Sequence, residues 1–198
     1  MAIVKIEISP YLKQFLIDKY GPEPISFPQN CMFMRHITEG CAPPPIIRKI
    51  LIEKFHPEDA ESEKMADSCW PGLETHSCSV RKEDSLLEVI LPKTVFRCGR
   101  IIETNNSWRL NYDSCRSFRK TADSMFWIDL NVYVDDYMRA RKANGEFYSR
   151  RSAILEFMSF HQIDSDALEA ILRQDVRRRK NLLNNKKTEE NGKKYAMA

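Results

Sequence analysis

The sequence predicts an α+β fold, with strands in an N-terminal part and a helical C-terminal half. Two observations support this class. Short apolar segments near the start of the chain and before residue 92 have the spacing of β-strands. From about residue 113 onward, apolar residues instead recur every three or four positions, which is typical of helices that bury one face.

The N-terminal part begins with a predicted strand over residues 2–8, where apolar and polar residues alternate. Ser9 and Pro10 have the character of an N-cap and a first helical residue, and Gly21 is typical of the position after a helix. A short helix is therefore expected between Pro10 and Gly21. The prolines spread over residues 22–45 favour an irregular, extended path.

The middle of the chain is less regular. A helix is expected over residues 45–56, with a strand as the alternative because the segment is rich in isoleucine. Residues 56–85 are polar and acidic, which indicates a long surface loop. The segment 86–92 predicts a second strand, and 95–103 predicts a third with Gly99 at a bend.

Three helices are predicted in the C-terminal half. A long one should run over residues 114–142, with Gly145 just beyond its end. A second covers residues 147–160, and a third begins with Asp164 or Ser165 as its N-cap. Because two short helices cannot enclose a core alone, the long helix must supply a third wall. The result is a three-helix unit that resembles helix-turn-helix proteins.

The domain limits follow from this change of pattern. An α+β part with proline-rich and acidic loops is expected over residues 1–112, and the helix-turn-helix-like part over 113–183. Residues 184–198 have little apolar content to bury, so a frayed or disordered tail is predicted there.

Positive charge is concentrated near the C-terminal end. The net charge is +3, but the residues from Arg139 onward carry 14 Lys and Arg against 8 Asp and Glu, a net +6 that leaves −3 for the rest. This asymmetry indicates an acidic partner, or else only a well-solvated helix. No apolar run approaches the roughly 18 to 20 residues of a membrane span. The first residues do not resemble an export signal, so a cytoplasmic chain with reduced cysteines is expected.

The basic residues of the last two helices are the candidate nucleic-acid-binding site. Arginine suits phosphate because its planar group donates two parallel hydrogen bonds. Acidic residues at the start of the third helix, such as Asp166 and Glu169, would be repelled by a phosphate-lined groove, so contacts to the backbone should outweigh base readout. The expected partner is double-stranded DNA. The candidate contacts are Arg150, Arg151, Arg173, Gln174, Arg177, Arg178 and Lys180.

Two segments carry a family resemblance: "KIEISPYLKQFLIDKYG" near the start, and "AILEFMSFHQI" followed by "LEAILRQDVRRRK" near the end. In these segments the chain resembles small, mostly uncharacterised proteins encoded by phages and mobile elements of Bacteroidetes-type bacteria. Such proteins are labelled DNA-binding, so the resemblance implies a non-enzymatic accessory or regulatory role on DNA. It transfers no catalytic residue.

A protein-interaction or assembly module, including a homo-oligomer, is the rival function. Basic residues late in a helix also complement its dipole, and Asp175 with Arg179 has the spacing of a local ion pair. Trp127, Val134 and Met138 lie off the main apolar stripe of the long helix. If exposed, they would form an apolar patch for a partner protein or a second copy.

No enzymatic activity and no cofactor are predicted. Cys69, His76 and Cys78 lie close in sequence, but they lack the closely spaced cysteine pair that structural zinc sites use, and metal binding there stays open. Asp135 and Asp136 are helix neighbours that point about 100° apart and cannot converge on one cation by themselves. Glycine-rich phosphate loops and nucleophile elbows are absent from the sequence.

Overall fold

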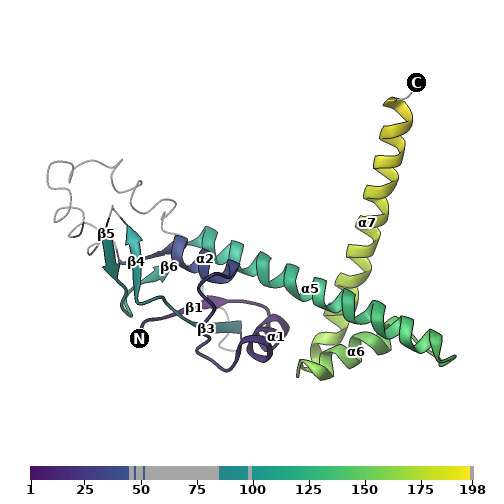
Figure 1. Ribbon diagram of the computed structural model, residues 1–198, viewed down its shortest axis with the longest axis horizontal. Coiled ribbons are helices and arrows are strands. Elements are labelled where there is room, and N and C mark those ends of the chain that lie inside the picture. The colour runs from purple at the N-terminus through teal and green to yellow at the C-terminus, as the bar shows by residue number, and fades with distance from the viewer. Residues whose placement is uncertain (45–46, 48–50, 52–84, 98–99, 197–198) are drawn as a thin grey trace. The chain divides into compact units, whose positions relative to one another are not determined.

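A computed structural model describes residues 1–44, 47, 51, 85–97 and 100–196 (Figure 1). The fold is α+β, as predicted: the described strands all precede residue 111, and the C-terminal half is helical. The chain divides into two compact units, Met1–Ile128 and Asp129–Ala198. Their boundary lies inside the long helix α5 (Tyr112–Ala143), so this helix contributes to both units rather than opening a separate domain at residue 113.

The first unit contains the predicted sheet. β1 (Ile3–Glu7) pairs antiparallel with β3 (Leu86–Ile90), which confirms the two strands expected over 2–8 and 86–92. Alternate side chains of both strands are buried, and these are Val4, Ile6, Leu87 and Val89. This alternation arises because successive side chains of a strand point to opposite faces, of which only one packs on the core.

The helix expected after Pro10 is α1 (Pro10–Tyr20). Ser9 is its N-cap residue, but its side chain makes no capping hydrogen bond. Gly21 ends the helix with a φ of 104°, a left-handed conformation that glycine adopts without a Cβ clash, and its N–H donates to the carbonyl of Ile17 at 2.9 Å. The inner side of α1 contributes fully buried residues such as Phe15 to the core.

The prediction of an irregular path over residues 22–45 is wrong in part. α2 (Met32–Gly40) lies within it, and β2 (Cys41–Ala42) pairs with β6 (Arg109–Leu110). No proline occurs between Pro28 and Pro43. Within that gap, Phe33, Met34 and Ile37 have helical spacing and are buried, and the thiol of Cys31 caps the helix by accepting from the Met34 N–H at 3.4 Å.

The segment predicted as one bent strand over 95–103 is a hairpin. β4 (Thr94–Arg97) and β5 (Arg100–Glu103) pair antiparallel, with Val95 opposite Ile102. A bent strand and a hairpin share the same apolar pattern, and Gly99 itself lies outside the described residues. Of the helix predicted over 45–56, only residues 47 and 51 are described, and the predicted loop over 56–85 falls almost wholly outside them.

Aromatic rings from four segments fill the core of the first unit. Phe27 stacks on Phe33 at 4.8 Å between ring centroids, Phe33 contacts Phe118 of α5 at 4.7 Å, and Phe15 meets Phe126 edge to face at 5.4 Å. Such aromatic pairs add to the free energy that burial of their area already supplies. Phe118 and Phe126 are both fully buried, so these rings belong to the core.

The second unit is formed by the rest of α5 with α6 (Arg150–Phe160), the 3-10 turn η2 (Ser165–Ala167) and α7 (Leu168–Ala196). The predicted long helix and the helical pair are confirmed, although α6 begins at Arg150, later than expected. α7 continues to Ala196, so residues 184–196 are helical and not the frayed tail predicted from their polarity. Lysine and glutamate have a high intrinsic helix propensity, so this polar segment can be helical without burying apolar side chains.

In the described part of the chain, no helix combines the length and apolar character that a membrane span requires.

His36 of α2 makes a hydrogen bond of 2.9 Å with the hydroxyl of Thr121 on α5. Burial lowers the pKa of His36 below its usual value of 6.5. Glu39 opposes this shift, and Arg35 adds to it. The neutral imidazole is therefore the form that the folded chain prefers.

Replacing His36 by glutamine should reduce the pH dependence of stability between about pH 7.5 and 5.5. Because the folded pKa is depressed, the unfolded chain binds the proton first as the pH falls through 6.5, and the wild type should lose stability in that window. Urea unfolding at the two pH values measures the loss, which should be smaller in His36→Gln, a variant that can still bond to Thr121. Equal losses in both proteins would contradict this role for His36.

Candidate nucleic-acid interface

The turn between α6 and α7 is built by a backbone motif that sets the angle between the two helices. The N–H of Ile163 donates to the carbonyl of Met158 at 2.8 Å, and the N–H of Gln162 donates to that of Ser159 at 3.2 Å. This is the Schellman pattern, in which Gln162 occupies the left-handed position with a φ of 52°. Ile163 is buried, as the sequence predicted for the residue that fills the gap between the helices.

Apolar residues from all three helices form the core of the second unit. Leu130 and Val134 of α5 are fully buried, so the apolar surface patch considered for Val134 does not form, and Trp127 is likewise buried in the first unit. Two apolar residues of the helical pair do not pack inward: Leu155 of α6 is 41% exposed and Val176 of α7 is 43% exposed. The buried residues of the helical pair are Ala153, Ile154, Phe157, Met158, Leu168 and Ile171.

Asp175 replaces Val176 on the buried face of α7. Its side chain is 3% exposed and accepts two hydrogen bonds from Arg150, Nε to Oδ2 at 2.9 Å and Nη2 to Oδ1 at 2.7 Å. Arg179 adds an ion pair with Oδ2 at 2.9 Å, and Asn131 of α5 accepts from Arg150 Nη2 at 2.8 Å. These contacts tie α5, α6 and α7 together at one buried carboxylate. We call them the Asp175 clasp.

The two arginines of α6 are thus bound within the protein. Arg150 is only 21% exposed and is held in the Asp175 clasp. Arg151 is exposed and lies 3.1 Å from Glu169 of α7. Sequence alone does not show these contacts, because the carboxylates that bind the arginines are 25 and 18 residues away.

Three cations of α7 lie opposite its buried face. At 3.6 residues per turn, Arg173, Arg177 and Lys180 fall within about 60° of one another, on the side away from Leu168, Ile171 and Asp175. All three are exposed. We call Arg173, Arg177 and Lys180 the basic stripe.

The contacts of the basic stripe leave its positive charge largely uncompensated. Arg173 donates from Nε to the backbone carbonyl of Glu169 at 3.1 Å. Among the residues that the structure describes, neither Arg177 nor Lys180 has a carboxylate partner. Of the remaining sequence candidates, Gln174 is half-buried and lies about 60° around the helix from Arg177. Arg178 is exposed but projects about 100° away from Arg177, so it is not part of the stripe.

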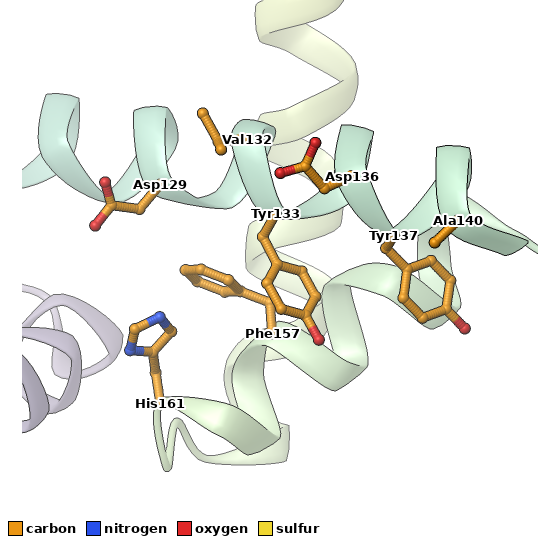
Figure 2. Close-up of a pocket in the computed structure, with 8 residues that line it drawn as sticks. All are labelled: Asp129, Val132, Tyr133, Asp136, Tyr137, Ala140, Phe157 and His161. Atoms are coloured by element: carbon orange, nitrogen blue, oxygen red, sulfur yellow. The ribbon is translucent and has the colours of Figure 1, made fainter.

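A groove along α5 and α6, which sequence reasoning did not find, lies elsewhere in this unit (Figure 2). Its volume is about 540 Å³. Phe157 and His161 of α6 line one wall, and Figure 2 shows Asp129 and His161 at one end and Ala140 at the other. A signal was present in the sequence, since the residues that α5 contributes recur every three or four positions. They are Asp129, Val132, Tyr133, Asp136, Tyr137 and Ala140.

The rings in this groove contact one another. Tyr133 lies 5.5 Å from Phe157 between centroids and 6.5 Å from Tyr137, and Phe157 lies 4.3 Å from His161. Burial raises the pKa of Tyr133, and its hydroxyl donates to Glu156 at 3.0 Å, which raises the pKa further. Tyr133 is therefore a neutral hydrogen-bond donor and not a base near neutral pH.

Metal ligands do not gather in the part of the chain that the structure describes: no group of three or more His, Cys, Asp or Glu side chains there could hold an ion. Cys69, His76 and Cys78, the candidate zinc ligands, lie outside the described residues. The described cysteines Cys31, Cys41 and Cys115 form no disulfide bond within the described part of the chain.

Gln162→Gly should stabilise the protein. A non-glycine residue in the left-handed region costs about 1–2 kcal/mol, whereas glycine adopts it freely but loses more entropy on folding, so a net gain of roughly 0.5–1 kcal/mol is expected. Urea unfolding measures the change. The matched control is Ser159→Gly within α6, which should instead destabilise by about 0.5–1 kcal/mol. A loss of stability in Gln162→Gly would show that this side chain has another role.

Asp175→Ala should destabilise the second unit by about 3 kcal/mol or more, because it leaves Arg150 largely buried without its counter-charge. Glu169→Ala removes the exposed pair with Arg151 and should cost at most about 1 kcal/mol. Thermal and urea unfolding of the two variants provide the comparison. Similar losses would mean that the Asp175 clasp does not hold the helices together.

No family model, no curated protein and no solved structure matches this chain. Function is therefore inferred from the cations exposed on α7 and from the contacts that orient them.

Proposed function

We propose that this chain is a non-enzymatic protein that binds double-stranded DNA through the phosphate backbone, using the basic stripe of α7. The observation that carries the proposal is the position of the stripe. Its three cations share one exposed side of a helix whose opposite side is packed, and Arg177 and Lys180 have no described carboxylate partner. An accessory or regulatory role in a phage or mobile element is the setting that the sequence resemblance implies.

The length of the stripe limits the number of contacts. Arg173 and Lys180 are seven residues apart, or about 10 Å along the helix axis at 1.5 Å per residue. Duplex DNA rises about 3.4 Å per base pair, so the stripe covers roughly three base pairs and reaches about three phosphates. This is fewer than the six candidate cations named from the sequence, because Arg150 and Arg151 are bound to carboxylates and Arg178 projects to another side of α7.

The two arginines of α6 receive a supporting role in this proposal. Arg150 holds α7 through the Asp175 clasp, and Arg151 neutralises Glu169 in the first turn of α7. Neutralising that carboxylate reduces the repulsion between the acidic start of α7 and an approaching phosphate. Gln174 is uncharged and would add a hydrogen bond to the flanking backbone without changing the salt dependence.

Binding to a duplex of about 30 base pairs should weaken with salt at a slope near −2.7 in log–log form, the value for about three phosphate contacts. The association constant should therefore fall about 40-fold between roughly 50 and 200 mM salt. Fluorescence anisotropy of a labelled duplex measures both quantities. In Arg173→Gln/Arg177→Gln/Lys180→Gln the slope should fall to near zero, since each lost contact reduces it by about one.

The matched control is Arg116→Gln/Lys120→Gln/Lys142→Gln, which removes the same charge from exposed positions of α5. This variant should bind nearly as well as the wild type, because it loses the same net charge but keeps every contact of the basic stripe. Equal weakening in both triple variants would show that overall charge, and not the stripe, binds DNA.

A further inference from the structure

We propose that the groove along α5 and α6 receives the basic stripe of a second copy of this chain. The groove presents two kinds of chemistry together. Aromatic rings of Tyr133, Tyr137 and Phe157 line its length, and Asp129 and Asp136 add negative charge (Figure 2). Aromatic faces and carboxylates are the surfaces to which arginine side chains bind best, by stacking and by paired hydrogen bonds.

The protein already places one guanidinium against this surface. Arg141 lies over the ring of Tyr137, with its central carbon 5.2 Å from the ring centroid, while it also pairs with Glu146. Arg141 therefore shows a guanidinium stacked on one of the rings that line the groove.

The spacings of the groove and of the basic stripe match. Asp129 and Asp136 are seven residues apart on α5, and Arg173 and Lys180 are seven residues apart on α7, so both pairs span two helical turns, or about 10 Å. Arg177 lies between the two outer cations. With α7 of one copy laid along α5 of another, each carboxylate can face a cation at the same time.

Apolar contacts supplement this match of charge. Val176 of α7 lies beside the stripe and is 43% exposed, and Val132 of the groove is 58% exposed. Among the described residues, Asp136 makes an exposed ion pair with Arg139 at 3.2 Å, and the two side chains are 65% and 79% exposed. Such surface pairs are weak, so Asp136 can exchange Arg139 for a cation of a second copy.

The occupant is a second copy because the stripe does not enter the groove of its own chain. Arg173, Arg177 and Lys180 are exposed, which they would not be if they filled it. Two copies related by a two-fold axis can each offer a stripe to the groove of the other, so the same contact is made twice. Since nucleic acid would use the same cations, self-association and DNA binding should exclude each other. Only this last consequence rests on the proposed function.

Sedimentation velocity of the full chain, with charge-reversed variants, tests the interaction. Asp129→Lys/Asp136→Lys reverses the groove, and Arg173→Glu/Arg177→Glu/Lys180→Glu reverses the stripe. The wild type should form dimers at roughly 50 μM in low salt, and each variant alone should self-associate on the order of tenfold more weakly or not at all. An equimolar mixture should form a heterodimer, because each reversed surface then meets an opposite charge.

A monomeric wild type, a groove variant that still dimerises, or a mixture that stays monomeric would overturn the proposal. Circular dichroism checks that the variants are folded. If the groove variant is not, the milder Asp136→Asn, at an exposed position, should still weaken dimerisation measurably. Dimerisation without DNA binding would leave this inference standing and refute the proposed function, whereas DNA binding by a strictly monomeric chain would do the reverse.

Discussion

A buried carboxylate shared between two arginines determines which side of α7 faces outward. Asp175 is 3% exposed, and removing such a group from water is costly unless its charge is balanced and its oxygens are hydrogen-bonded. Arg150 satisfies both oxygens, and Arg179 adds a second cation from the next turn of α7. The carboxylate must face α6 to accept the hydrogen bonds of Arg150, and this requirement restricts the rotation of α7 about its own axis. The basic stripe on the opposite side must then face outward.

The same geometry divides the cluster of basic residues from Arg177 to Lys180 into different roles. Consecutive residues of a helix point about 100° apart, so a run of four cations cannot act as one surface. Arg179 turns inward to Asp175, whereas Arg177 and Lys180 turn outward with Arg173. These four consecutive residues are therefore one structural arginine, Arg179, one arginine that points to a third side of the helix, Arg178, and two members of the stripe.

The second unit displays complementary surfaces, and this gives its two proposed interactions a common basis. The stripe offers cations on an exposed helix, and the groove offers rings and carboxylates along another helix of the same unit. Phosphate and carboxylate compete for guanidinium groups through the same paired hydrogen bonds. Under the two proposals, DNA and the groove of a second copy would compete for the same cations, and their concentrations would decide which one is bound.

Periodicity in the sequence by itself determined the α+β class, both strands of the first sheet, α1, the long helix and the helical pair, because burying one face imposes a repeat of two or of about 3.6 residues. It also determined which cations share a side of α7.

The sequence analysis missed α2, because the high density of prolines around it hid a short amphipathic segment. It also predicted β4 and β5 as a single strand, because a hairpin and a bent strand have the same apolar pattern. Only the tertiary structure decided which arginines are exposed, since Arg150 and Asp175 are 25 residues apart and meet through packing that no local pattern encodes. The groove also depends on the tertiary structure, because its walls come from two helices, and only the packing of the core determines which sides of them face each other.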